Sequence, residues 1–215
     1  MLLVVGVLAV GAAAATAPRV AHTSAGTKQA QRSMLRVGDF GSGWTATAAK
    51  AGSSGLNFAC VGFSPKQNDV VEIGAANSQQ FKGGAVGPFV VQRTSVYASA
   101  AVAERLWKRA LKPKLFDCAV QSLETLKQQG LGVEVTGRKT IAIGSLGDGA
   151  AGYRVVATLS GKQRLKTYYD LIYVMGGRSI TQLTISQFQK PVPLKWQVAL
   201  AKVAARRLGA AGPAA

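Results

Sequence analysis

The clearest hydrophobic pattern in this 215-residue chain is an alternation of apolar and polar residues near its middle. The stretch PFVVQRTSVYA, rich in Val, Thr and Tyr, predicts a half-buried strand over about residues 89–97. Ser99 then stands where a helix N-cap is expected, and Pro113 ends that helix. Between them the apolar residues recur on one helical face, as Val102, Leu106 and Ala110 beside Ala103, Trp107 and Leu111.

A second helix is predicted directly afterwards. Its apolar residues again recur at helical spacing, as Phe116, Ala119, Val120, Leu123 and Leu126. Gly130 supplies the C-terminal stop. Cys118 therefore falls in the first turn of this helix, close to its core face. Nearer the N-terminus, QAQRSMLRVGDFGSGW predicts a short helix that ends near Arg36, because three glycines follow closely.

The C-terminal half changes to strand patterns. Residues 131–188 contain four or five such stretches, and Gly176 with Gly177 indicates a two-residue hairpin between the last two. A final helix is marked by Leu194, Val198, Ala201, Ala205 and Leu208, with Lys195, Lys202 and Arg206 outward. Because tight connections favour antiparallel neighbours, we expect a single-domain α+β fold in which an antiparallel sheet is flanked by helices.

The N-terminus has the form of a secretory signal peptide. An apolar stretch is followed by small residues that offer Ala-x-Ala cleavage sites, although no Lys or Arg precedes the stretch. We therefore expect a secreted or otherwise extracytoplasmic protein, with membrane association as an alternative. The expected organisation is a signal peptide over residues 1–17, a flexible linker over 18–32, the folded domain over 33–209 and a tail over 210–215.

The chain has only two cysteines, Cys60 and Cys118. In an exported protein such a pair indicates one disulfide, and two cysteines allow a single intramolecular connectivity. The alternative is a pair of buried free thiols that pack as small hydrophobic groups.

Charge is the unusual feature of the composition. Twenty-six Lys and Arg against nine Asp and Glu give a net charge of +17. This balance favours contact with polyanions, although a basic surface also simply maintains solubility. Export makes nucleic acid a poor partner and the cell envelope a better one. The candidate anion-binding residues form one stripe on the predicted helix that Pro113 ends: Arg105, Lys108, Arg109 and Lys112. A solvated helix face is the other interpretation of this stripe.

Motifs that resemble catalytic sites lack their structural context. GDGAAG, residues 147–152, matches a dinucleotide-binding pattern but leads into a predicted strand instead of a helix. The only histidine, His22, leaves neither cysteine with an obvious activating base. Asp148 and Asp170 remain the one carboxylate pair that could meet in a cleft. No spacing typical of a zinc or calcium site is present, so we expect no metal and no cofactor.

The order of features resembles the PknH-like extracellular sensor domains and related secreted proteins and lipoproteins of high-GC bacteria. The similarity runs over about residues 33–208, through SMLRVGDFGSGWT, Cys60, SAAVAERLWKRA, FDCAVQSL, GSLGDGAAGYRV and YYDLIYVMGGRSITQL. It implies a PsbP-like α/β sandwich, and a disulfide between Cys60 and Cys118 near a cleft that takes an unidentified ligand. The second disulfide of the kinase sensor domains has no counterpart here, and neither does a kinase domain.

Three functions are therefore open. The first is a secreted, non-enzymatic binding or sensor-type domain of the cell envelope, with a small or envelope-derived ligand. The second is a cationic adhesion module that holds anionic wall or membrane polymers through the basic stripe. The third is a hydrolase with an unrecognised site. The shortage of catalytic side chains disfavours any enzyme.

Overall fold

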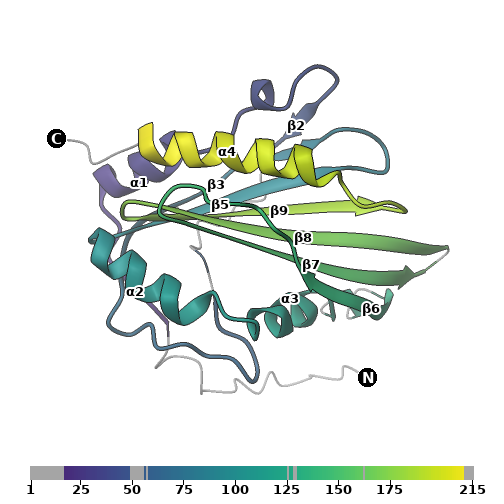
Figure 1. The fold of residues 1–215 in the computed structure, drawn as a ribbon, viewed down its shortest axis with the longest axis horizontal. Helices are drawn as coiled ribbons and strands as arrows, with labels where there is room; N and C mark the ends of the chain where they lie inside the picture. Colours follow the sequence, from purple (N-terminus) through teal and green to yellow (C-terminus); the bar gives the residue numbers. More distant parts are fainter. Residues whose placement is uncertain are drawn as a thin grey trace, which may run out of the picture.

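The described residues of the computed structural model form one nine-stranded sheet in the order β1-β3-β5-β9-β8-β7-β6 (Figure 1). The strands on this path are β1 (Arg19–Val20), β3 (Val71–Asn77), β5 (Phe89–Tyr97), β9 (Ser179–Phe188), β8 (Arg164–Gly176), β7 (Gly149–Ser160) and β6 (Gly132–Thr140). Two short strands lie off it, β4 (Gln80–Lys82) on β5 and β2 (Thr45–Thr47) on β4. The structure describes residues 17–48, 56, 58–124, 126–127, 130–161 and 163–210.

The expected single-domain α+β fold, a sheet flanked by helices, is confirmed, and the sheet is mixed because one of its pairs is parallel. Each pairing between described strands is antiparallel except that of β1 with β3. A parallel pair requires a long connection between its strands, and here β1 is joined to β3 through about 50 residues that include a helix. Strand β1 is held beside β3 by two backbone hydrogen bonds, from the Arg19 N–H to the Val70 carbonyl and from the Ala21 N–H to the Glu72 carbonyl.

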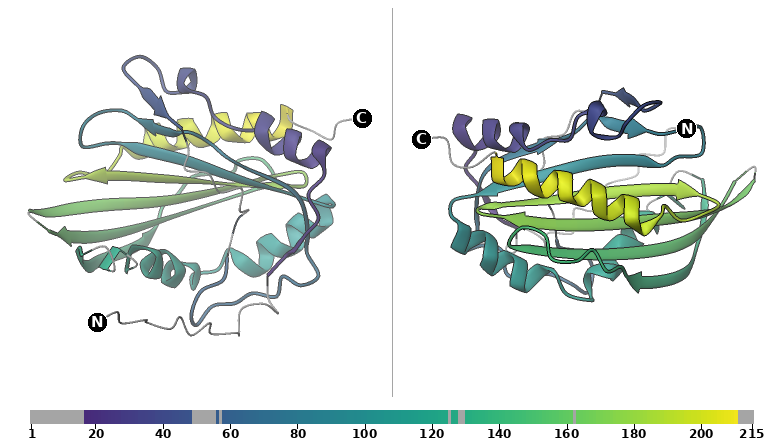
Figure 2. Two further views of the ribbon diagram at one scale, coloured as in Figure 1. Left: turned by 180° about the vertical axis from the view of Figure 1, so that it is seen from behind. Right: turned by 45° about the horizontal axis from the view of Figure 1, so that its top comes forward.

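Helices cover both faces of the sheet, so the domain has three layers. Helices α1 (Ser24–Arg32) and α4 (Leu194–Ala210) lie on one face, and α2 (Ala100–Ala110) and α3 (Leu115–Glu124) lie on the other (Figures 1 and 2). Strand β8 shows why this face division holds. Its residues alternate between the two cores, with Leu171 and Tyr173 in the core beneath α2 and α3, and Ile172 and Val174 in the core beneath α4.

Several predictions from the sequence are confirmed in detail. The predicted strand at residues 89–97 is β5, with the same limits. Ser99 caps α2, because its side chain accepts a hydrogen bond from the Val102 backbone N–H. The buried residues of α2 are Ala103, Leu106 and Ala110, on the predicted apolar face. The hairpin between β8 and β9 is present, but Gly176 pairs with Ser179, so the two turn residues lie one position later, at 177 and 178.

The expected flexible linker over residues 18–32 is wrong. This segment contains β1 and α1, and α1 packs directly on the sheet. The packing is close because Gly26 of α1 faces Gly74 of β3, and a Cβ on either glycine would collide with the backbone of the other element. Thr23 caps the helix by accepting a bond from the Gly26 N–H. The sequence predicted a short helix that ends near Arg36, whereas α1 ends four residues earlier, at Arg32.

Helix α4 is present as predicted, with Ala201 and Leu208 buried and Lys195, Lys202 and Arg206 exposed, but its N-terminal part buries a different residue from the one expected. Leu194, expected on the apolar face, is 43% exposed, while Gln197 is fully buried. Gln197 is buried because its side chain donates hydrogen bonds to Asp170 on β8 and to the Val192 carbonyl. Residues 1–16 of the expected signal peptide, and 211–215 of the expected tail, lie outside the described residues.

Candidate functional site

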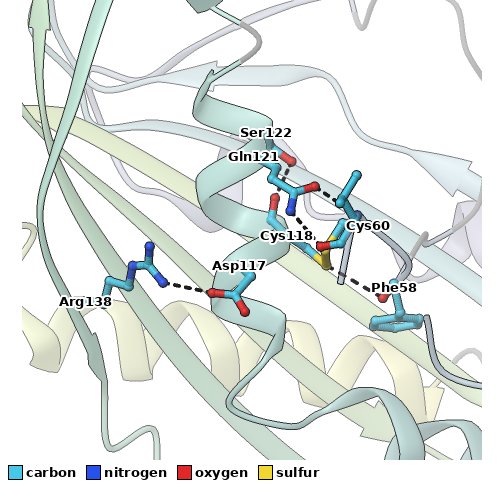
Figure 3. Close-up of a disulfide and its surroundings, with 8 residues drawn as sticks. Phe58, Cys60, Asp117, Cys118, Gln121, Ser122 and Arg138 are labelled. Carbon is cyan, nitrogen blue, oxygen red and sulfur yellow. Dashed lines mark hydrogen bonds and ion pairs between the residues drawn. A yellow bond between two sulfur atoms is a disulfide. The ribbon is translucent and has the colours of Figure 1, made fainter. Parts of the chain in front are cut away.

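The predicted disulfide is present and joins a loop to helix α3. Cys60 and Cys118 are bonded, with their Cα atoms 5.2 Å apart (Figure 3). The loop is also packed against the sheet, because Phe58 is fully buried and its ring lies 5.8 Å from that of Tyr173 on β8. The alternative of two free thiols is therefore excluded, and both sulfur atoms are occupied by each other.

A second polar contact fastens the same loop to α3. Cys60 and Phe63 exchange two backbone hydrogen bonds around a tight turn, in which Gly62 has a φ of 83°. Gln121 of α3 reaches this turn, where its side chain accepts from the Val61 N–H at 3.0 Å and donates to the Val61 carbonyl at 2.8 Å. The Val61 side chain is left 84% exposed at the tip of the turn.

Beside this loop the described residues enclose a cleft of about 1150 Å³. One wall is α3 with the disulfide, through Leu115, Cys118 and Ala119. The floor is the sheet, on the face that carries α2 and α3. Strands β3, β5, β9 and β8 contribute to this floor Asn77, Val91, Arg93, Gln182, Thr184, Tyr169, Leu171 and Tyr173.

The floor of the cleft is polar at its centre. Strand β9 lies between β5 and β8, within a sheet that carries helices on both faces (Figure 1). Here Gln182 and Thr184 are only half-buried and face the cleft, and the Gln182 side chain donates to the Thr184 hydroxyl at 2.9 Å. Beside them on β5, Val91 is 38% exposed. This part of the sheet is therefore open to a molecule in the cleft.

Arg93 is the only charged side chain among the described residues that line the cleft. It is paired in register with Gln182 on one side and Asn77 on the other, so these three side chains form a row across the floor. Its Nε donates to the Asn77 side-chain oxygen at 3.1 Å. This bond orients the exposed guanidinium group, whose two terminal nitrogens make no hydrogen bond to another described residue.

Two tyrosines of β8 complete the floor, and burial decides their protonation. Desolvation raises the pKa of Tyr169 above its usual value, while a hydrogen bond with Thr184 and the charge of Arg93 lower it in part. Desolvation also raises the pKa of Tyr173, supported by the neighbouring tyrosines and opposed by Arg93. Both phenols are therefore neutral near neutral pH and act as hydrogen-bond donors and acceptors.

The predicted basic stripe does not line the cleft: Arg105, Lys108 and Arg109 lie on α2, and Lys112 lies just beyond the last residue of that helix, Ala110. Two of its members are ion-paired: Lys108 with Glu104 at 2.6 Å and Arg109 with Asp69 at 2.7 Å. Hydrogen bonds from these bases lower the pKa of Glu104 and of Asp69. Arg105 and Lys112 are exposed at the surface. The basic stripe therefore lies apart from the cleft, and two of its four positive charges are neutralised by ion pairs.

The acidic residues of the whole chain are occupied in the same way. Seven of the nine form an ion pair with a Lys or Arg, Glu72 lies within hydrogen-bond distance of His22, and Asp148 accepts a bond from the Gly177 backbone N–H. Since nine acids cannot partner 26 bases, the surplus positive charge stays on the surface. Among the residues that line the cleft in the described parts of the chain, none is acidic.

The remaining candidates for catalysis lie apart from one another and from the cleft. Asp148 directly precedes β7, and its side chain reaches Gly177 in the β8–β9 turn. Asp170 lies within β8, where it is 1% exposed and bonded to Arg154 by two short contacts of 2.6 and 2.7 Å. The two carboxylates therefore do not form a pair. The Nε2 of His22 lies within hydrogen-bond distance of a Glu72 carboxylate oxygen, at 2.8 Å. Residues 147–152 lead into β7, a strand, as expected.

Sequence reasoning did not identify the residues of the floor. Arg93 and Gln182 were each seen only as polar positions of half-buried strands, which normally face solvent. Their alignment depends on the β5–β9 register, which joins residues about 90 positions apart in the chain. The available signal was the charge of Arg93 in an otherwise uncharged strand.

Among the described residues, no group of three His, Cys, Asp or Glu side chains could hold a metal ion. No helix in that part of the chain is both long and apolar enough to cross a membrane. In comparisons with known proteins, neither a protein-family model nor a curated protein matches this chain.

Proposed function

We propose that this protein is a secreted, non-enzymatic binding domain of the cell envelope, of the sensor type, and that its ligand occupies the cleft beside the disulfide. The observation that carries this proposal is the polar, half-buried floor of the cleft at Gln182 and Thr184. A central strand that exposes polar side chains toward a large hollow is suited to hydrogen bonds with a bound molecule. The volume of about 1150 Å³ suits a ligand at or above the size of an ordinary metabolite.

Binding without catalysis agrees with the groups around the cleft. Both cysteine sulfurs are consumed by the disulfide, so neither is available as a thiolate. The one histidine is bonded to Glu72, outside the cleft lining. The polar groups on the floor are carboxamides, hydroxyls and a guanidinium, which recognise ligands but transfer protons poorly at neutral pH.

The cellular setting rests on two features of the chain. The N-terminal sequence is typical of an export signal, and the disulfide agrees with an oxidising compartment. The three-layer arrangement is compatible with the PsbP-like sandwich implied by the resemblance to PknH-like sensor domains. A disulfide at the edge of a cleft is the arrangement expected from that resemblance.

Filling the cleft tests the proposal. Val91→Trp would place a large side chain over the floor without removing a hydrogen bond, and Val86→Trp is the matched control at an exposed valine outside the lining. Envelope glycans, lipids and metabolites would be screened by thermal shift against wild type and both variants. A ligand at about 100 times its Kd should raise the Tm of wild type and of Val86→Trp by about 5–10 °C.

The same shift should be absent from Val91→Trp. A ligand that stabilises all three proteins equally would contradict a cleft site. A screen in which no compound distinguishes wild type from Val91→Trp would do the same.

A second candidate is the cationic adhesion module, favoured by the surplus of bases over acids. On this reading, Arg105 and Lys112 hold anionic polymers by charge alone. Binding to anionic vesicles should then weaken steeply with salt and should be lost when the four stripe residues are neutralised. Affinity that is independent of those substitutions would end this candidate.

A further inference from the structure

We infer that the ligand of the cleft is a polyhydroxylated anion of the acidic-sugar class, whose carboxylate or phosphate group binds Arg93. This inference rests on the proposed function, since it assumes that the cleft is occupied. It is carried by three kinds of group that meet on one floor: a guanidinium, paired carboxamide and hydroxyl groups, and apolar patches beside them.

The guanidinium gives the ligand its charge. Arg93 lies in a cleft whose described lining contains no acid, so its charge has no counterion there. Asn77 accepts from the Nε of this exposed arginine, so the two terminal nitrogens are its remaining pair of donors. Such a pair matches two oxygens of a carboxylate or phosphate. The net charge of +17 adds a positive field that draws anions toward the cleft.

The floor next to Arg93 is suited to hydroxyl groups. Gln182 lies directly opposite Arg93 in the β5–β9 register, and its amide nitrogen is bonded to Thr184. The Gln182 oxygen remains to accept a bond, and the neutral Tyr169 phenol beside Thr184 adds a further polar group. A sugar hydroxyl can both donate and accept, as these groups require. An alkyl chain would bury them without partners, at the cost of their hydration.

Apolar side chains flank Thr184 in the row of the floor next to the polar one. Val91 is two positions from Arg93 on the same face of β5, roughly 7 Å away, and Leu171 lies on β8, with Thr184 of β9 between the two. Across the cleft stand Leu115 and the disulfide. A sugar ring has polar edges and apolar C–H faces, so it can satisfy the row of polar groups and the apolar wall together.

Defined probes and one pair of variants test the inference. Trigalacturonate carries both charge and hydroxyls, its methyl ester keeps the hydroxyls without charge, and hexanoate keeps the charge without hydroxyls. Glucose 6-phosphate tests phosphate in place of carboxylate. Binding would be measured by calorimetry at about 0.15 M salt, where charges more than about 8 Å apart are largely screened and a direct contact with Arg93 is retained. Arg93→Gln is compared with Arg105→Gln, a second exposed arginine that lies outside the cleft.

We expect trigalacturonate or glucose 6-phosphate to bind wild type and Arg105→Gln alike, and Arg93→Gln at least about tenfold more weakly. The methyl ester and hexanoate should each bind at least about tenfold more weakly than trigalacturonate. Equal binding of the methyl ester, tighter binding of hexanoate, an unchanged affinity in Arg93→Gln, or no binding of either acidic sugar would overturn the inference. A compound that Val91→Trp excludes but Arg93→Gln still binds would refute the ligand class and leave the proposed function intact.

Discussion

Opening the Cys60–Cys118 disulfide should lower the free energy of unfolding by about 4 kcal/mol. The two residues are 58 positions apart, and the chain between them includes β3, β5 and α2. For a loop of this length, chain entropy lost from the unfolded state amounts to about 14 cal/mol/K, which gives about 4 kcal/mol at 25 °C. For a domain of this size the Tm should fall by about 8–16 °C.

Urea unfolding of the oxidised and the dithiothreitol-reduced protein measures this difference. The double variant Cys60→Ala with Cys118→Ala is the control, since reductant should leave its midpoint unchanged. We also expect a larger m-value after reduction, because the unfolded chain without the disulfide is more expanded and exposes more surface. A stability change below about 1 kcal/mol, with equal m-values, would refute the loop-entropy argument.

Three further predictions concern burial and close packing. Asp170→Asn should cost about 3–5 kcal/mol in urea unfolding, because it leaves the buried Arg154 without a countercharge, whereas Glu134→Gln at an exposed pair should cost less than about 1 kcal/mol; equal costs would contradict this. Gly74→Ala should release α1 from the sheet by forcing its backbone away from Gly26, and amide exchange in α1 should accelerate; unchanged exchange would count against it. Four tyrosines, Tyr97, Tyr153, Tyr169 and Tyr173, have a pKa raised by burial, so stability should be unaffected below pH ~10 and should fall as the pH rises past that value. In a Tyr168→Phe variant these four are the tyrosines that remain, and tyrosinate absorbance that appears before unfolding would contradict this.

The sequence predicted those elements whose signals are local. The limits of β5 and the Ser99 cap of α2 follow from alternation and from one side-chain bond within a few residues. The disulfide could also be predicted, because composition left one pairing. In contrast, the 18–32 segment has a mean polarity typical of a linker, and its fold depends on Gly26 meeting Gly74 nearly 50 residues away. Its small residues at helical spacing, Gly26 and Ala30, were the overlooked signal.

The site was less predictable than the fold. A single strand pattern cannot distinguish a polar residue that faces bulk solvent from one that faces a cleft. Arg93 and Gln182 become neighbours only through the register of β5 with β9, and the cleft exists only because the Cys60 loop and α3 stand over them. The basic stripe, which was apparent in the sequence, lies on α2 and just beyond its end because amphipathic helices expose their charged face.

An amide NMR titration of the isotope-labelled protein with the soluble glycan fraction of the cell envelope tests the cleft most directly. We predict that the shifted resonances cluster on β5, β9 and α3, around Val91, Arg93 and Thr184. Shifts confined to the exposed face of α2, or no shifts at all, would contradict a ligand site in the cleft.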